Sequence, residues 1–392
     1  MQLTVSAEEK QFREEVRTWL SENVPKDRLP PIGEEHKAFL KEWQKKQFDG
    51  GWAGIDWPRE YGGRGLSIIE QIIWFEEYVR AGGPDSGCLF VGLKHGGPTL
   101  IVRASEEQKS FHLPAILKGE QIWCQGFSEP GAGSDLAGLR TRGVIDGDHI
   151  VVNGQKIWTS YAQLADYQEL LIRTDPEMSK HRGLTWVIGD MSLPGITVRP
   201  IQSIDGEYHN CEVFYDNVRI RLKNVVGQVG EGWRVAMSTL SFERGTSFMH
   251  FQLELSHAIE ELIRMAGERK GRDGRVLIKD DAIASRLARL RGEVAALRSM
   301  TYMAASRGSR QDMPGPEGTY LALFYGEVVQ RVMAAAMDVL GPDSLMFDAH
   351  DCEAWTHRYL RTFASTIGGG TSEIRRNIVG ERVLGLPRDS RA

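Results

Sequence analysis

The sequence predicts an α+β fold in which a β-rich central domain separates two helical domains. Three observations lead to this prediction. Apolar residues recur at helical spacing up to about residue 120, short β-rich runs with turn signals follow to about residue 233, and long helical patterns then continue. We therefore expect an N-terminal helical domain over 1–120, a central antiparallel β domain over 121–233 and a C-terminal domain like a four-helix bundle over 234–392.

The N-terminal region begins with a helical pattern. Ser6 precedes AEEKQFREEVRTWL, in which Phe12, Val16 and Leu20 recur at helical spacing. A second helix, KAFLKEWQKKQFDGG, ends at a pair of glycines, as helices often do. WAGIDWPREYGGRG then breaks the pattern with aromatic residues, a proline and glycines, which predicts a shaped loop. The helical period resumes in LSIIEQIIWFEEYVRAG and EEQKSFHLPAIL.

The central region carries the signals of β-hairpins. RGVIDGDHIVVNGQKIWTS contains two β-rich runs around Asp146 and Gly147, and a further turn at Asn153 and Gly154. YQELLIRT, LTWVIGDM, GITVRPI and CEVFYDNVRI continue the pattern with no helix between them. This order predicts a small antiparallel barrel or sandwich.

The C-terminal region reads as long amphipathic helices. GWRVAMSTLSFERGTSFMHFQLELSHAIEELIRMAGER places Phe251, Leu255, Ala258 and Leu262 on one stripe. DAIASRLARLRGEVAALRSMTYMAA and TYLALFYGEVVQRVMAAAMDVLG follow with similarly wide apolar faces. Helices of this length predict a bundle.

The composition excludes several classes of protein. A chain of 392 residues with 41% hydrophobic and 26% charged residues is typical of a globular protein with two or three packed units. A net charge of −5 argues against a nucleic-acid partner, and no apolar run reaches the roughly 20 residues that span a bilayer. The N-terminus lacks a signal-peptide pattern. The scattered cysteines favour a reducing, cytoplasmic location; they are Cys88, Cys124, Cys211 and Cys352.

The most informative stretch for chemistry is WCQGFSEPGAGSDLAGLRT, Trp123 to Thr141. Ser128, Gly133 and Ser134 offer hydroxyls and closely approachable backbone amides in a turn with little bulk. Such a turn suits the polar edge of a planar ligand or a phosphate. An ordinary tight turn with a Pro-Gly breaker explains the spacing equally well.

Several motifs, taken in order, resemble the acyl-CoA dehydrogenase family along the whole chain. They are WPREYGGRG, SEPGAGSD, NGQKIWTS, GGGTSEI and ERVLGLP. The pattern is similar in particular to bacterial heteromeric steroid or fatty-acyl-CoA dehydrogenase subunits. The resemblance implies two helical domains around a β domain, FAD as cofactor and an acyl-CoA substrate. It also implies oxidation to the 2,3-enoyl-CoA, with electrons passed to electron-transfer flavoprotein.

The resemblance assigns roles to individual residues. Ser134 is expected to touch the CoA part of the substrate. Trp158 is expected to pack on the flavin and Ser160 to hydrogen-bond near its N5 atom; without the resemblance, Trp158 would be assigned to the core. The full set of expected FAD-binding residues is Phe127, Ser128, Gly133, Trp158, Ser160, Thr371 and Glu373.

The catalytic base is expected in an unusual place. Most relatives carry it just before the Gly-Thr pair of the C-terminal loop, which here is Gly369 and cannot take a proton. A minority carry it in a Glu-Arg pair on the first long helix of the C-terminal domain. Glu243 and Arg244 match that pair, so we expect Glu243 as base and Arg244 beside the substrate. A solvated helix surface is the alternative for such a pair.

Two further departures from the family pattern concern assembly. In homotetrameric relatives, each subunit donates an Arg-x-x-Phe-Gly segment and a Gln-led segment with two glycines to its neighbour's FAD. The matching stretches here read KGRDG, Lys270 to Gly274, and DVLGPDS, which begins at Asp338. We therefore expect a tetramer that contains a sister subunit. A homo-oligomer with diverged FAD contacts is the alternative.

Three other interpretations are weighed against the leading one. DAHDCEAWTH, Asp348 to His357, gathers Asp, His and Cys but matches no zinc spacing, so no metal is expected. The chain would be a non-catalytic subunit if Glu243 had no role. It would be an acyl-CoA oxidase if dioxygen were consumed directly.

Overall fold

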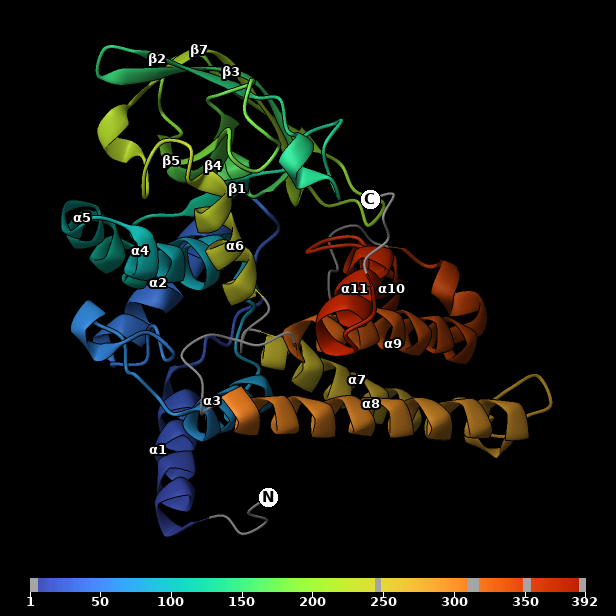
Figure 1. Cartoon of the computed structure of the whole chain (residues 1–392). Coiled ribbons are helices and arrows are strands. Elements are labelled where there is room, and N and C mark those ends of the chain that lie inside the picture. The colour runs from blue at the N-terminus through green and yellow to red at the C-terminus, as the bar shows by residue number, and fades with distance from the viewer. Residues whose placement is uncertain (1–5, 244–247, 309–316, 348–353, 388–392) are drawn as a thin grey trace. The chain divides into compact units, whose positions relative to one another are not determined.

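The protein is described by a computed structural model that covers residues 6–243, 248–308, 317–347 and 354–387. The order of helices, then strands, then helices confirms the expected fold class (Figure 1). Packing groups these elements into two compact units. One contains Met1–Leu20, Ser67–Gly82 and Arg244–Ala392, and the other contains Ser21–Leu66 and Gly83–Glu243. No helix among the described residues has a window long and apolar enough to cross a membrane.

The second unit contains the sheet. Its seven strands are β1 (Trp123–Gly126), β2 (Arg142–Asp146), β3 (His149–Ser160), β4 (Tyr167–Arg173), β5 (Leu184–Asp190), β6 (Ile196–Ile201) and β7 (Asn210–Arg221). They lie in the order β1-β4-β2-β3-β7-β6, with β5 paired to β4. Figure 1 shows β2, β3 and β7 curling over β1, β4 and β5. Most pairs are antiparallel, as expected, but β1 and β2 both pair with β4 in parallel.

The sheet encloses its own hydrophobic core. The two halves of the sheet join through a single residue pair, Arg142 with Arg173, and this narrow junction lets the sheet curl. Alternate residues of the long strands β3 and β7 point inward, including Ile150, Val152 and Val213, which are fully buried. The hairpin expected at Asp146 forms, because β2 and β3 pair in antiparallel register around it.

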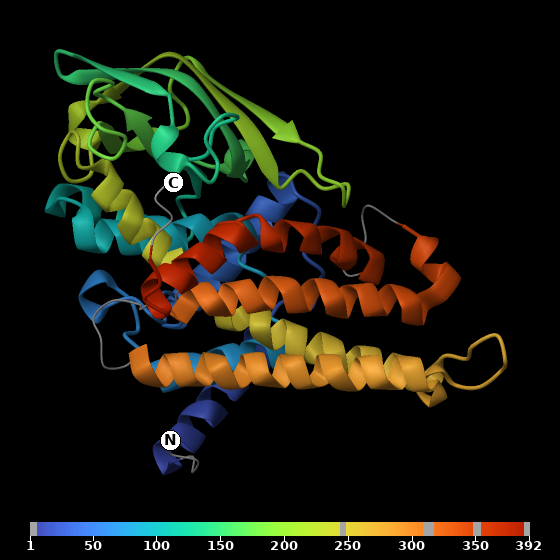
Figure 2. The same ribbon diagram turned by 45° about the vertical axis from the view of Figure 1, so that its right-hand side comes forward.

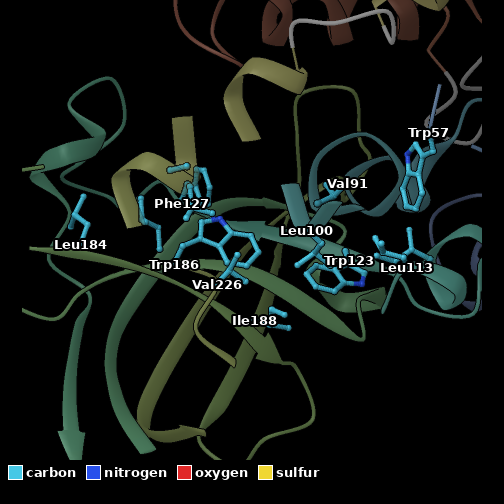
Figure 3. Close-up of a cluster of buried hydrophobic side chains, with 14 of the residues drawn as sticks. Trp57, Val91, Leu100, Leu113, Trp123, Phe127, Leu184, Trp186, Ile188 and Val226 are labelled. Carbon is cyan, nitrogen blue, oxygen red and sulfur yellow. The ribbon is translucent and has the colours of Figure 1, made fainter. Parts of the chain in front are cut away.

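Helices of the same unit pack on a second core. They are α2 (Glu34–Asp49), α4 (Gly97–Arg103), α5 (Glu106–Leu117) and α6 (Gly232–Glu243). Three buried tryptophans, Trp57, Trp123 and Trp186, belong to the cluster drawn in Figure 3. The Trp57 ring packs so closely on Gly97 that a Cβ there would lie 2.0 Å from it. The loop predicted from WAGIDWPREYGGRG thus supplies core residues.

Helix α6 is fixed at its start and along one side. At Gly232 a Cβ would lie 2.5 Å from the carbonyl carbon of Thr185, so α6 begins in direct contact with the backbone of β5. Farther along, Thr239 accepts a hydrogen bond from Thr99 of α4 at 2.9 Å, and Ser238 accepts one from Arg103 at 2.9 Å. These contacts set the direction in which α6 approaches its last residue, Glu243.

The first unit is a helical bundle. It contains most of α1 (Ala7–Asn23), and all of α3 (Ile68–Arg80), α7 (Phe248–Glu268), α8 (Asp281–Gly308), α9 (Glu317–Leu340), α10 (Trp355–Arg361) and α11 (Ser372–Ile378). Figure 2 shows α8 and α9 running alongside each other. Leu255, Ala258 and Leu262, expected on one stripe of α7, are all buried in this core. Packing thus joins α3 to the C-terminal helices, and the division into three domains along the chain stays a prediction.

A buried ion-pair cluster ties α1, α3 and α8 together. The Glu77 carboxylate is 1% exposed and accepts hydrogen bonds from Arg13 at 2.6 Å and from Arg17 at 3.0 Å. The neighbouring Glu76 pairs with Arg13 at 2.7 Å and with Arg298 at 2.6 Å. Burial by itself would raise the pKa of both carboxyl groups, but the hydrogen bonds and positive charges outweigh it and lower the pKa of each.

Replacing Glu77 by glutamine is expected to lower the free energy of unfolding by about 2 kcal/mol at pH 7, because the half-buried Arg13 and Arg17 lose the buried carboxylate that they share. A carboxyl group with a lowered folded pKa stabilises the protein above its unfolded pKa of 4.5, and this stabilisation is lost as pH falls through the folded pKa. The difference in free energy of unfolding between wild type and variant should therefore shrink below pH 4.5, and urea unfolding measures this difference. Glu14→Gln, which removes an exposed partner of Arg17, is the control. Equal stability of both variants at pH 7 would contradict the prediction.

Candidate active site

The Gly-rich turn after β1 is held in a defined shape. Glu129 and Ala132 exchange backbone hydrogen bonds at 3.1 and 3.0 Å, which closes a tight turn. The Ser128 carbonyl accepts a hydrogen bond from the Ile157 backbone N–H at 2.9 Å, and this bond joins the turn to β3. The Phe127 side chain is buried in the core, so only its main chain is available to a ligand.

A fully buried lysine holds this turn through hydrogen bonds, and the sequence interpretation missed it. Lys156 Nζ donates to the Phe127 carbonyl at 3.0 Å and to the Glu129 carboxylate at 2.8 Å. Glu129 also accepts the backbone N–H groups of Arg140 at 2.6 Å and Thr141 at 2.8 Å. One feature of the sequence could have indicated it. Lys156 stands in a predicted strand, at a position where the alternation of inward- and outward-facing residues points to the core.

The end of β3 presents an aromatic ring to the surface. Trp158 is 59% exposed and has a φ of 62°, a backbone conformation that a bulky residue rarely adopts. The register with β7 shifts between Lys156 and Thr159, and this bulge turns the indole outward while the Lys156 and Thr159 side chains stay buried. The alternative that Trp158 is a core residue is therefore wrong.

Donors and open space are also found along the turn, which the Ile157 N–H joins to β3. The Ser128 N–H has no acceptor among the described residues, and nothing lies within 4 Å of a Cβ built on Gly131 or Gly133. Ser134 is exposed, and the half-buried Ser160 hydroxyl donates to Asn210 Oδ1 at 3.2 Å. A hollow of about 280 Å³ opens beside the turn, lined by Glu129, Pro130, Gly131, Gly138, Arg140, Thr141, Gly154 and Gln155.

The C-terminal Gly-rich loop belongs to the other unit. Gly369 and Gly370 have φ values of 65° and 104°, in the region that favours glycine, so a glutamate at position 369 would be strained in this loop. Thr371 caps α11 by accepting the Ile374 N–H at 3.3 Å. The exposed Glu373 carboxylate accepts hydrogen bonds from the Glu373 backbone N–H and from the Thr371 hydroxyl, and these lower its pKa.

An arginine that the sequence interpretation did not single out anchors this loop. The buried Arg375 donates to the carbonyls of Ala322, Ser365 and Gly368 at 3.2, 2.9 and 2.6 Å. It therefore ties the loop to α9. The only sequence signal is an arginine two positions after Glu373, and nothing in its spacing distinguishes it from the exposed Arg376 that follows.

The expected base stands at the end of a well-anchored helix. Glu243 is the last residue of α6, and its backbone belongs to the same unit as the turn at Ser128 and the ring of Trp158. The position of its side chain lies outside what the structure describes, as does Arg244. Groups of three or more residues suited to hold a metal ion are absent from the described residues.

Sequence profiles of one family match the chain from end to end. The acyl-CoA dehydrogenase N-terminal domain matches residues 6–120, the middle domain matches 124–218 and the C-terminal domain matches 230–384. The acyl-CoA dehydrogenase IpdE1 of Mycobacterium tuberculosis is 38% identical over 388 residues, which cover 97% of this chain and 98% of that protein. The chain belongs to the acyl-CoA dehydrogenase family.

Solved structures agree with this assignment. A steroid ACAD named Tcur3481–Tcur3483 has a TM-score of 0.86 and 30% identity, with 99% of this chain and 100% of that chain covered. The ChsE4–ChsE5 complex from Mycobacterium tuberculosis has a TM-score of 0.84 and 30% identity, with the same coverage. The expected family is thereby confirmed.

Members of this family are FAD-dependent oxidoreductases, and the residues around Trp158 fit a flavin. An exposed indole offers an apolar face to a planar ring system. The Ser128 N–H, which has no acceptor within the described part of the chain, offers a donor to a polar ring edge, and the open Gly131 and Gly133 let backbone approach closely. The surface therefore has the apolar plane and the polar edge that an isoalloxazine ring requires.

Proposed function

We propose that this chain oxidises an acyl-CoA thioester to the 2,3-enoyl-CoA and that electron-transfer flavoprotein accepts the electrons. The observation that carries the proposal is the exposed Trp158 ring beside the clamped turn at Ser128, which suits a flavin. FAD, when bound, would supply the acceptor for the hydride equivalent that leaves the substrate β-carbon. The residues of the chain orient the reactants, and a carboxylate removes the α-proton. We expect this chemistry in the cytoplasm.

The family motifs support a set of roles for the site residues. We assign FAD contacts in the β domain to Phe127, Ser128, Gly133, Trp158 and Ser160. Thr371 and Glu373 are assigned to FAD from the motif alone, since their side chains already make the local hydrogen bonds that begin α11. Ser134 and Arg244 are assigned to the substrate.

We assign the catalytic base to Glu243. Gly369 offers no carboxylate, and its backbone conformation disfavours one. Glu243 ends a helix that packs on β5 and α4 of the unit that also contains Trp158. A carboxylate next to an apolar acyl group has a raised pKa, which brings it toward the range in which a general base works.

We further propose that the active enzyme is a heterotetramer. Asp338, in place of the glutamine that relatives donate to a neighbour's FAD, forms an ion pair with Arg286 of its own chain. Asp343 pairs likewise with Arg269. Two carboxylates on this segment would repel a pyrophosphate. The two arginines next to them are already paired with these carboxylates and do not offer a free positive charge. Two structural neighbours carry names that combine two different proteins, Tcur3481–Tcur3483 and ChsE4–ChsE5, and this supports the same conclusion.

Co-expression with a sister acyl-CoA dehydrogenase subunit is expected to give a complex with about one FAD for every two chains, because this chain keeps the residues that hold its own FAD but needs the sister subunit for the contacts that a neighbour donates. The measurement is flavin absorbance against protein concentration after size-exclusion chromatography. This chain expressed alone should lose most of its FAD. A homotetramer with one FAD in each chain would contradict the heteromeric assembly and leave the dehydrogenase assignment intact.

The substrate class follows from the relatives by analogy. The first structural neighbour is described as a steroid ACAD, so we propose an acyl group derived from a steroid. An anaerobic panel of straight-chain, branched and steroid-derived acyl-CoA thioesters, followed by bleaching of the flavin absorbance, tests this. Bleaching by none of them would contradict the proposed function. Rapid oxygen uptake with the active thioester would indicate an oxidase instead.

A further inference from the structure

The buried pair of Lys156 and Glu129 lies directly behind the proposed flavin turn. The Lys156 side chain is fully buried and Glu129 is 8% exposed. Burial lowers the pKa of Lys156 to about 8, although the Glu129 charge opposes this shift. Burial alone would raise the pKa of Glu129, but the Lys156 charge and hydrogen bonds to Thr141 and Arg140 lower it. The two groups form an ion pair, with Lys156 Nζ 2.8 Å from the Glu129 carboxylate.

Stability alone does not account for this pair. Removing two charges from water costs more than an average ion pair returns, and replacing a buried pair by neutral side chains of similar volume is often neutral or stabilising. The backbone of the turn is already held without the pair, by the Glu129–Ala132 hydrogen bonds and the bond from Ile157 to Ser128. The positive charge of Lys156 also has an electrostatic effect on the turn.

The positive charge acts on one peptide group in particular. Lys156 Nζ donates to the carbonyl oxygen of Phe127, and the same peptide ends in the Ser128 N–H. A cation on the carbonyl draws electron density through the peptide and makes its N–H a stronger donor. That N–H has no acceptor among the described residues. Since the carbonyl of the next peptide is bound by the Ile157 N–H, the donor is also fixed in direction.

We propose that Lys156, held in place by Glu129, is a positioning residue that orients and polarises the Phe127–Ser128 peptide toward FAD, and thereby tightens FAD binding and raises the reduction potential of the bound flavin. The inference rests on the proposed assignment of Ser128 to FAD. Reduced flavin carries more electron density than oxidised flavin, so a polarised N–H donor stabilises the reduced form more. Loss of the polarising Lys156 contact is expected to make the potential more negative.

The test uses the double variant Lys156→Met/Glu129→Gln, which removes both charges and leaves neither one unpaired. It is made in the complex with the sister subunit. FAD affinity is measured by fluorescence titration of the apoprotein, the flavin potential by equilibration with a redox dye, and the fold by thermal unfolding. We expect the thermal midpoint to stay near that of wild type, the Kd for FAD to rise about 10-fold and the potential to become more negative.

The matched control is Lys223→Met/Glu107→Gln, which removes an exposed pair of the same residue types, 3.2 Å apart, in the same unit. It should leave affinity and potential unchanged. A second variant, Lys156→Gln/Glu129→Gln, keeps neutral hydrogen-bond donors behind the turn. It is expected to shift the potential in the same direction with a smaller loss of affinity.

The outcomes separate this proposal from the proposed function. If a folded variant binds FAD with the affinity and potential of the control, the positioning role is wrong while the dehydrogenase assignment stands. If neither charge-removing variant folds, the pair serves stability and the positioning role is again wrong. If the wild-type complex holds no FAD at all, both the positioning role and the proposed function fail.

Discussion

Replacing Glu243 by glutamine is expected to lower the rate of flavin reduction about 10³-fold while FAD stays bound. Glutamine has nearly the volume of glutamate but cannot accept the α-proton. No other carboxylate is available at the position that most relatives use, because Gly369 occupies it. The measurement is anaerobic stopped-flow bleaching of the flavin absorbance with the best substrate of the acyl-CoA panel.

The control for this prediction lies just before the same helix. Glu231 precedes α6, and its partly exposed carboxylate lies 3.8 Å from Arg234. Glu231→Gln removes a carboxylate near α6 without touching the proposed base and should keep the wild-type rate. A Glu243→Gln enzyme with FAD bound and a rate within a few-fold of wild type would overturn the assignment of the base. It would favour the interpretation of this chain as a non-catalytic subunit.

The fold class was predictable because each of its signals is local. Helical spacing around Leu255 and Leu262 and the turn at Asp146 depend only on neighbours in sequence, and the structure confirms both. The parallel pairing of β1 with β4 was not predictable, since direction depends on how distant strands meet. The same holds for the packing of α3 on the C-terminal helices.

The candidate site was predictable only in part, for a related reason. Motifs located the turn at Ser128 and the ring of Trp158, because those residues stand next to distinctive neighbours in the sequence. The pair of Glu129 and Lys156 spans 27 positions, and a lysine in a strand is ordinarily assigned to the surface. Arg375 was missed likewise, because one of its carbonyl partners, Ala322, lies 53 positions away in α9, and the other two belong to a loop whose path the sequence does not reveal.

Replacing Gly232 by alanine is expected to lower the free energy of unfolding by about 3 kcal/mol. The new Cβ would lie 2.5 Å from the carbonyl carbon of Thr185 and 2.6 Å from both the Thr185 Cα and the Trp186 N. All three are backbone atoms of β5, which cannot turn aside as a flexible side chain can. Helix α6 must therefore move away from the sheet. Urea unfolding followed by tryptophan fluorescence measures the effect.

Gly292→Ala provides the comparison, since Gly292 lies within α8 and a Cβ there meets nothing within 4 Å. That change should stabilise the protein by about 1 kcal/mol, because alanine favours a helix over glycine. Gly232→Ala should also slow flavin reduction, since a shift at the start of α6 moves Glu243 at its end. A Gly232→Ala protein as stable and as fast as wild type would mean that α6 does not rest on the backbone of β5. An unstable protein with an unchanged rate would mean instead that the position of Glu243 is set by the residues that follow α6.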